Sequence, residues 1–177
     1  MTPGEARTGG EARTGGEART GGEARAAHRY QVSCTWQGST GEGYATYGRA
    51  HRASAPPARA AVQLSSDPAF HGDAALLNPE QLVVMAASSC QLLSFLAVAA
   101  RARVDVVSYE DSAEGEMPAG EEGVGLSRIM LHPVVTVMRG PALDQLSRLA
   151  AVAHRQCYVA NSLRTPVIVE TEFVILD

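Results

Sequence analysis

The sequence predicts an α+β domain in which antiparallel strands surround one long, buried helix. Residues 78–104 form a single apolar run with the start signals of a helix, and residues 30–37 alternate apolar and polar side chains as a half-buried strand does. The predicted order β-β-β-α-β-β-α-β lacks the regular alternation of a parallel α/β sheet. With 177 residues, 45% of them apolar, the chain is long enough for one domain with its own core.

The long helix is predicted to begin at Asn78, whose short side chain is a favourable N-cap. Pro79 suits the first helical position, and the charge of Glu80 suits the positive end of the helix dipole. A helix that is apolar on all sides is either a core helix or a membrane span, and residues 82–100 are about long enough for a span. We interpret the run as a core helix and expect no membrane association, because four polar residues interrupt it: Ser88, Ser89, Gln91 and Ser94.

Residues 1–28 are predicted to be a disordered tail, and residues 29–177 a single domain. The tail repeats the motif GEARTG, which has no apolar side chain larger than alanine and cannot bury enough surface to offset the entropy of ordering. The three parts of a signal peptide are not recognisable in it. Because the three cysteines are also too few and too scattered for a disulfide framework, we expect a cytoplasmic protein.

Three strands are predicted before the long helix. In the first, over residues 30–37, Cys34 shares a face with Trp36, and we interpret it as a small core side chain. The second strand is predicted over Tyr44–His51 and the third over Ala61–Ser65, followed by a loop to residue 77.

Beyond the helix, the pattern predicts a hairpin, a second helix and a final strand. One strand is expected over Asp105–Met117 and its partner over Leu126–Met138, with Pro133 marking a bulge or an edge. Apolar residues at helical spacing predict an amphipathic helix over Ala142–Gln156. The chain then closes with a strand over Val167–Ile175.

Several kinds of binding are disfavoured. The net charge is −4 and every basic residue is an arginine, which indicates a compositional bias and no nucleic-acid surface. The glycines match neither a dinucleotide nor a phosphate-binding motif, and we expect no organic cofactor. His154 and Cys157 stand at a metal-binding spacing, but no second pair of ligands lies nearby in sequence, so no metal site is predicted.

The thiol of Cys90, near the middle of the long helix, is the first candidate for chemistry. A reactive thiol must ionise, which a buried apolar setting opposes, so Cys90 needs a cation from another element. Arg49 and Arg52 are the candidates, and Glu80 is the carboxylate that would orient the arginine. Glu80 and Cys90 are ten residues apart, which is about 15 Å along a straight helix. Either the helix breaks between them, or the site combines residues of two subunits.

Cys157 is the candidate for a second thiol, because it lies between a predicted helix and a possible short one, a position that can lower a thiol pKa. Two such cysteines suit a peroxide-reducing cycle, in which one becomes a sulfenic acid and the other condenses with it to a disulfide. From spacing alone, two unrelated core cysteines remain the commoner interpretation, because free cysteine is among the most buried residue types.

The motif NPEQL at residues 78–82, with a cysteine ten residues after its glutamate, resembles the helix of the OsmC/Ohr family, named for the osmotically inducible protein C and the organic hydroperoxide resistance protein. The block AHRQCYVANSLRTPVIVE at residues 153–170 is similar to the region around the family's second cysteine. The resemblance covers most of residues 30–177. It implies the OsmC-like fold and an intertwined homodimer with both active sites at the subunit interface, in agreement with the 15 Å estimate.

By this resemblance, Cys90 is the peroxidatic thiol, Cys157 is the resolving thiol, and Glu80 holds the activating arginine. The segment YGRAH at residues 47–51 resembles one OsmC-like branch, which favours Arg49 over Arg52 as that arginine.

The resemblance implies a peroxiredoxin-like, thiol-dependent peroxidase that reduces organic hydroperoxides to alcohols in oxidative-stress defence. Such an enzyme needs no metal, but it does need an external dithiol as reductant. Family members usually carry proline after the second cysteine, where this chain has Tyr158, so its substrate range and reductant stay open. Two alternatives also stay open: a non-catalytic dimeric binding protein for an apolar ligand, and a thiol redox sensor.

Overall fold

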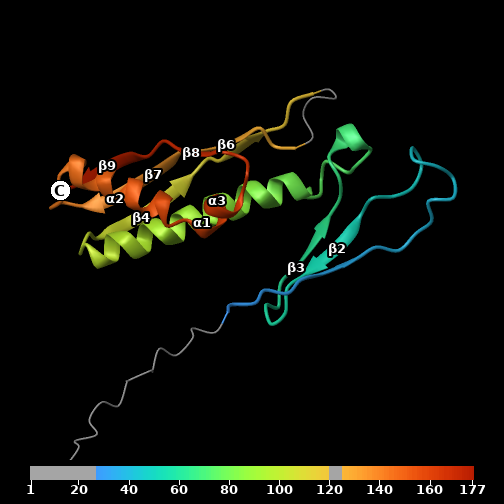
Figure 1. Cartoon of the computed structure of the whole chain (residues 1–177), viewed down its shortest axis with the longest axis horizontal. Coiled ribbons are helices and arrows are strands. Elements are labelled where there is room, and N and C mark those ends of the chain that lie inside the picture. Colours follow the sequence, from blue (N-terminus) through green and yellow to red (C-terminus); the bar gives the residue numbers. More distant parts are fainter. Residues whose placement is uncertain (1–26, 120–124) are drawn as a thin grey trace, which may run out of the picture. The chain divides into compact units, whose positions relative to one another are not determined.

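The computed structural model describes residues 27–119 and 125–177 (Figure 1). The chain divides into two units, Met1–Tyr30 and Gln31–Asp177, and every helix and strand described below belongs to the second. The predicted tail, residues 1–28, lies almost entirely outside the described residues.

The long helix, α1, spans Pro79–Arg101 without a break. Its predicted N-cap is confirmed, because the Gln81 N–H donates to Asn78 Oδ1 over 2.8 Å. The Asn78 N–H donates in return to Gln81 Oε1 over 3.0 Å, which completes a capping box that the sequence interpretation missed. The helix ends at Arg101, three residues before the predicted Val104. Arg103, just beyond this end, has a left-handed backbone conformation with φ 58°, as His71 has with φ 62°.

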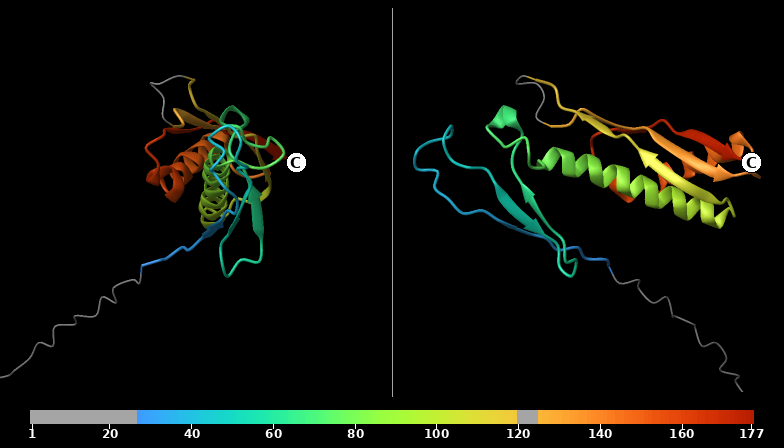
Figure 2. Two further views of the ribbon diagram at one scale, coloured as in Figure 1. Left: turned by 90° about the vertical axis from the view of Figure 1, so that its right-hand side faces the viewer. Right: turned by 180° about the vertical axis from the view of Figure 1, so that it is seen from behind.

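Two three-stranded sheets pack against α1, which runs along them in the views of Figure 2. The first has the order β4-β7-β9 (Val106–Asp111, Pro133–Met138 and Glu172–Leu176), and the second has the order β5-β6-β8 (Glu114–Glu116, Arg128–Leu131 and Val167–Val169). The pairs β4–β7 and β5–β6 are antiparallel, as predicted, whereas β7–β9 and β6–β8 are parallel. The parallel pairs form because α2 (Leu143–Arg155) and α3 (Tyr158–Ser162) carry the chain across before its last strands.

Each strand predicted beyond α1 is in fact two strands. The ranges 105–117, 126–138 and 167–175 hold β4 with β5, β6 with β7, and β8 with β9. Asp111 ends β4, and His132 lies between β6 and β7. There the Asp111 carboxylate accepts the His132 N–H over 2.8 Å, in place of a backbone partner in a strand. Pro133 follows directly and has no N–H to donate, so it marks a discontinuity in the sheet, in line with its prediction.

The N-terminal strands form a third sheet of order β1-β2-β3 (Ser33–Thr35, His51–Ser54 and Ala61–Leu64), in which β1 is shorter than predicted and β3 nearly matches. The prediction for the second strand was wrong in its position. Residues 44–47 form turns because the Arg49 guanidinium donates to the carbonyl oxygens of Tyr44 and Tyr47, over 2.5 and 2.6 Å, and folds this segment back on itself. Pairing therefore starts only at His51.

The prediction that Cys34 is a core side chain was also wrong for a single chain, since Cys34 is exposed. The register places it opposite Ala53, which pairs in turn with Val62, so one face of the small sheet is apolar as the alternation predicted. The described residues leave most of that face exposed, because Leu64 is the one residue of these three strands that is buried.

α1 packs against two separate apolar clusters. Its C-terminal half contributes Phe95, Val98 and Ala99 to a cluster with β7 and α2, and its N-terminal half contributes Ala87 to a cluster with β6. By length and composition α1 could cross a membrane. Five of its side chains are buried within the domain, and the others are partly or fully exposed in one chain. The predicted α+β class with a long central helix is confirmed.

Candidate active site

Two polar residues, Cys90 and Gln91, separate the two apolar clusters at the middle of α1, and we call this region the polar seam. Ala87 belongs to one cluster and Phe95 to the other, and Cys90 and Gln91 lie between them. In the same way, Cys157 lies between Ala153 of the first cluster and Val159 of the second. Each thiol therefore stands at the junction of the two halves of the core.

The Cys90 sulfur is partly exposed and receives a backbone hydrogen bond. The donor is the N–H of Val159 in the first turn of α3, 3.4 Å from Cys90 Sγ. The first N–H groups of a helix have no partner within it and favour an anion. This contact joins the middle of α1 to the segment that follows Cys157.

Cys157 is fully buried at the N-cap position of α3. Burial is the largest cause that raises the pKa of its thiol to about 11; the Ala160 backbone N–H lowers the pKa, the nearby Cys90 raises it, and the Val159 backbone N–H lowers it slightly. Cys157 is therefore a thiol at neutral pH. The structure brings Cys90 and Cys157 together, although the sequence separates them by 67 residues.

Behind the thiols, α1 is joined to β4 by a short hydrogen bond from Ser88 Oγ to Asp111 Oδ2, at 2.5 Å. The other oxygen of Asp111 accepts the His132 N–H. The Asp111 carboxylate thus connects the point where the two sheets separate to the polar seam on α1. Asp111 was not among the residues that the sequence singled out, although the small polar cluster around residue 88 could have drawn attention to it.

Arg49 lies away from both cysteines of its own chain. Its guanidinium is held by the Tyr44 and Tyr47 carbonyls and lies over both tyrosine rings, 4.8 and 4.1 Å from their centroids. It lines a small pocket that also includes Pro79, the first residue of α1. Arg52 is an exposed residue of β2, opposite Thr35 and Gln63.

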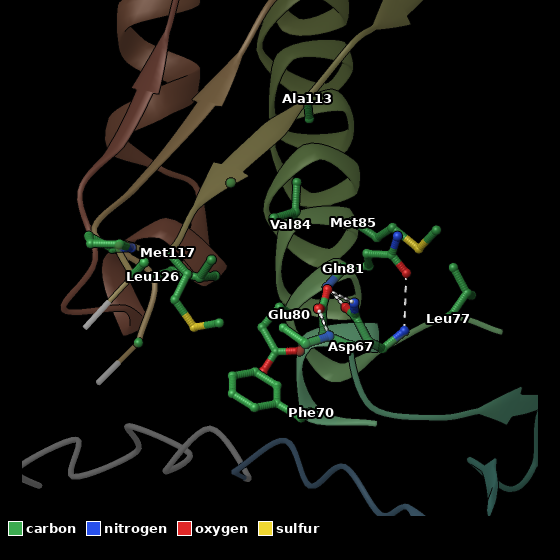
Figure 3. A pocket seen from close by; sticks show the side chains of 16 residues that line it. Asp67, Phe70, Leu77, Glu80, Gln81, Val84, Met85, Ala113, Met117 and Leu126 are labelled. Carbon is green, nitrogen blue, oxygen red and sulfur yellow. Dashed lines mark hydrogen bonds between the residues drawn. The ribbon is translucent and has the colours of Figure 1, made fainter. Parts of the chain in front are cut away.

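Glu80 lines a larger pocket of about 1140 Å³ at the start of α1 (Figure 3). Glu80, Val84 and Met85 of α1 form one side of it, and residues that flank β5 and β6 form the other, with Met117 and Leu126 labelled there in Figure 3. Among the described residues, Glu80 forms no ion pair with Arg49 or Arg52. Since α1 is unbroken from residue 80 to residue 90, the alternative in which a helix break brings Glu80 to Cys90 is excluded.

His154, considered with Cys157 as a possible metal pair, has a buried Nδ1 without a hydrogen-bond partner. Within residues 27–119 and 125–177, no group of three histidine, cysteine or acidic side chains is placed to hold a metal ion.

Residues 71–172 match the family model OsmC, described as OsmC-like protein. The chain belongs to the OsmC-like family. The match includes α1, the elements from β4 to β8 and both cysteines of the seam, but it leaves out the N-terminal sheet, Arg49 and nearly all of β9. A search of curated proteins found no match.

Solved structures agree with this assignment. An OsmC-like protein of unknown function from Vibrio cholerae is 30% identical, with a TM-score of 0.73 over 82% of this chain and 99% of that chain. An organic hydroperoxide resistance protein OsmC from Legionella pneumophila is 18% identical, with a TM-score of 0.61 over 84% and 98%. The organic hydroperoxide resistance protein OhrB of Bacillus subtilis is 18% identical, with a TM-score of 0.55 over 83% and 98%. Proteins named for peroxide resistance thus share the OsmC-like fold.

Proposed function

We propose that this OsmC-like protein is a thiol-dependent peroxidase that reduces organic hydroperoxides to alcohols. The observation that carries the proposal is the 3.4 Å hydrogen bond from the Val159 N–H to Cys90 Sγ, because Val159 lies two residues after Cys157 and so brings the segments of the two cysteines together in the polar seam between two apolar clusters. Two unrelated core cysteines would need no such contact. The names of the peroxide-resistance proteins with the same fold support the choice of substrate class.

The cycle has three steps. The Cys90 thiolate attacks the terminal oxygen of the hydroperoxide, the O–O bond breaks, and the sulfur becomes a sulfenic acid while the alkoxide takes a proton to give the alcohol. The Cys157 thiol then attacks the Cys90 sulfur, an S–S bond forms, and hydroxide leaves with the Cys157 proton as water. An external dithiol returns two electrons and restores both thiols.

The surroundings of the two thiols favour this division of roles. Cys90 is partly exposed, so it is accessible, and it receives the Val159 N–H. Cys157 is fully buried and its pKa is raised, so it stays protonated and shielded from peroxide until Cys90 is oxidised.

Arg49 and Glu80 are proposed to act on the Cys90 of a second subunit. Glu80 lies about 15 Å from the Cys90 of the same chain on an unbroken helix, and Arg49 lines a pocket with Pro79 at the start of that helix. In trans, the Arg49 guanidinium would stabilise the thiolate and the developing alkoxide, and the Glu80 carboxylate would orient Arg49.

A homodimer is supported by apolar surfaces that one chain leaves uncovered. The outer face of α1 exposes Met85, Leu93 and Leu96 at helical spacing, with exposed fractions of 50%, 62% and 37%. The apolar face of the β1-β2-β3 sheet is uncovered as well. Exposed apolar surface of this kind marks a protein interface, and a second copy that covers both would also bring Glu80 to the other subunit's thiol.

The pocket beside Glu80 supports an organic substrate. Its walls carry Phe70, Leu77, Val84, Met85, Met117 and Leu126, and these apolar side chains suit a hydrocarbon group better than hydrogen peroxide. The three free thiols fit a reducing, cytoplasmic setting.

A steady-state assay tests the proposal. Wild-type protein is given cumene hydroperoxide or hydrogen peroxide, with dihydrolipoamide or a thioredoxin system as reductant. We expect turnover of cumene hydroperoxide that is lost in Cys90→Ser and kept in Cys34→Ser, the matched control at an exposed thiol. Absence of turnover with either reductant, in protein whose Cys90 still reacts with iodoacetamide, would contradict it.

The same pocket gives a second candidate function, the binding of an apolar ligand without catalysis. Neither cysteine lines the pocket within one chain, so binding there would not need Cys90. Co-purification of a lipid-like ligand, with unchanged affinity in Cys90→Ser, would favour this function over the peroxidase.

A further inference from the structure

Two buried polar atoms beside the thiol pair have no hydrogen-bond partner among the described residues: Gln91 Oε1 and Tyr109 OH. Gln91 follows Cys90 in α1, and Tyr109 of β4 is close enough to Cys157 for their charges to interact. An unpartnered buried polar group costs about 1–3 kcal/mol, so native proteins keep such groups where water binds or where they have a function.

The contacts between α1 and β4 place these two side chains at the same level. Ser88, Gln91 and Phe95 share one face of α1, because they are three and four residues apart. Tyr109 and Asp111 share one face of β4, because they are two residues apart. Ser88 bonds Asp111 over 2.5 Å and the rings of Phe95 and Tyr109 lie 6.1 Å apart, so these contacts enclose Gln91 from both sides and set it against β4.

The two groups are chemically complementary. A phenol can donate and accept a hydrogen bond, and an amide oxygen accepts. A buried water is retained where it finds two to four polar partners. Tyr109 OH and Gln91 Oε1 are both unpartnered among the described residues, and Cys157 is close enough to Tyr109 for their charges to interact. Burial also raises the pKa of Tyr109, with Asp111 and Cys157 as further causes, so the phenol stays a neutral donor at physiological pH.

We propose that Tyr109 and Gln91 hold an internal water beside Cys157, and that this water relays the proton that Cys157 loses when it attacks the oxidised Cys90. The inference rests on the proposed function and assigns two positioning residues to its second step. The Cys157 S–H bond breaks as the S–S bond forms. The proton passes through the water to the hydroxide that leaves Cys90, and the products are the disulfide and one water molecule.

The pH dependence of disulfide formation reports on this relay. The titratable groups on the elements around Cys157 include Cys90 of α1, Tyr109 and Asp111 of β4, and His154 of α2. Without a relay, Cys157 must lose its proton to solvent before it attacks, so the rate should rise steeply with pH up to the pKa of about 11. With the relay, the rate at neutral pH should depend less on pH.

The test separates the two chemical steps in wild type, Tyr109→Phe and Gln91→Met. Reduced protein is mixed with cumene hydroperoxide, quenched at intervals and analysed by mass spectrometry for the Cys90 sulfenic acid and for the disulfide, between pH 6 and pH 9. We expect sulfenic acid to form at the wild-type rate in both variants. Disulfide formation should slow about tenfold or more at pH 7 and recover as the pH rises. Since both residues hold one water, the double variant should be no slower than either single variant.

The outcomes distinguish the two proposals. Disulfide formation at the wild-type rate and pH dependence in both variants would overturn the relay and leave the peroxidase intact. A slowing that stays constant across the pH range would indicate a packing defect and would also overturn the relay. Wild-type protein that forms no sulfenic acid would overturn the proposed function, and the relay with it.

Discussion

The backbone N–H of Val159 donates to the sulfur of Cys90 over 3.4 Å, across 69 residues of sequence. Val159 lies in the first turn of α3, directly after the segment that holds Cys157 as its N-cap. The junction of α2 and α3 therefore contacts one thiol and buries the other. A change in that junction should affect both steps of the proposed cycle.

Tyr158→Pro should be tolerated at this junction. Tyr158 is the first residue of α3 and is 84% exposed, and Cys157 before it has φ −71° and ψ 106°, which suits a residue that precedes proline. We expect the free energy of unfolding to stay the same or rise by about 0.4–1 kcal/mol, because proline restricts the unfolded chain. Urea unfolding measures this, with Tyr158→Ala as control. A loss of stability in the proline variant alone would show that the backbone here does not have the described conformation.

Leu93→Glu should weaken the dimer. Leu93 is 62% exposed in one chain, on the face of α1 proposed to meet a second copy, so a charge there would be buried on association. We expect a shift towards monomer in sedimentation velocity and a fall in peroxidase activity. Leu143→Glu is the matched control, since Leu143 is 57% exposed at the start of α2 and outside that face. Equal dimerisation of both variants would place the interface elsewhere.

Stability should fall as the pH rises from about 9 towards 11. Burial raises the pKa of Cys157 from 9.0 to about 11, so between these values the folded state keeps a proton that the unfolded state has lost. Stability from this group is thus complete below pH 9 and is lost through pH 11. Urea midpoints against pH, under reducing conditions, should show a steeper decline in wild type than in Cys157→Ala. Equal slopes in the two proteins would contradict the shift.

Gly115→Val should destabilise the protein through one contact. A Cβ at Gly115 would lie 2.6 Å from Cγ2 of Val84, where β5 crosses α1. We expect a loss of about 1–3 kcal/mol from overpacking, measured by urea unfolding. Val84→Ala, combined with Gly115→Val, should recover part of that loss because it removes the obstructing methyl groups. A double variant that is no more stable than the sum of the two single effects would argue against this contact.

Local patterns were sufficient to predict α1 and α2. Asn78 and Pro79 carry the start signal of α1, and the apolar spacing after residue 142 carries that of α2. The strand breaks at Asp111 and His132 could not be predicted in the same way, because a side chain that bonds a distant backbone N–H divides the strands there. The parallel placement of β8 and β9 likewise depends on how α2 and α3 pack.

The sequence proposed residues for the candidate site but could not give the geometry in which they lie. The motif around residues 78–90 pointed to Cys90 and Glu80, and helix geometry already set them about 15 Å apart. The approach of Cys157, the Val159 N–H and the enclosure of Gln91 depend on contacts between residues far apart in sequence. Cys34 shows the converse, because its alternating pattern indicates an apolar face correctly but does not say that the described residues leave that face exposed.

The most direct test of the peroxidase is to map the oxidised thiols. Reduced wild-type protein is treated with one equivalent of cumene hydroperoxide, digested without reductant and analysed by mass spectrometry. The proposed cycle predicts a peptide pair joined by a Cys90–Cys157 disulfide, with Cys34 still a free thiol. Protein in which Cys90 stays reduced, or in which Cys34 joins either cysteine in place of the expected pair, would contradict it.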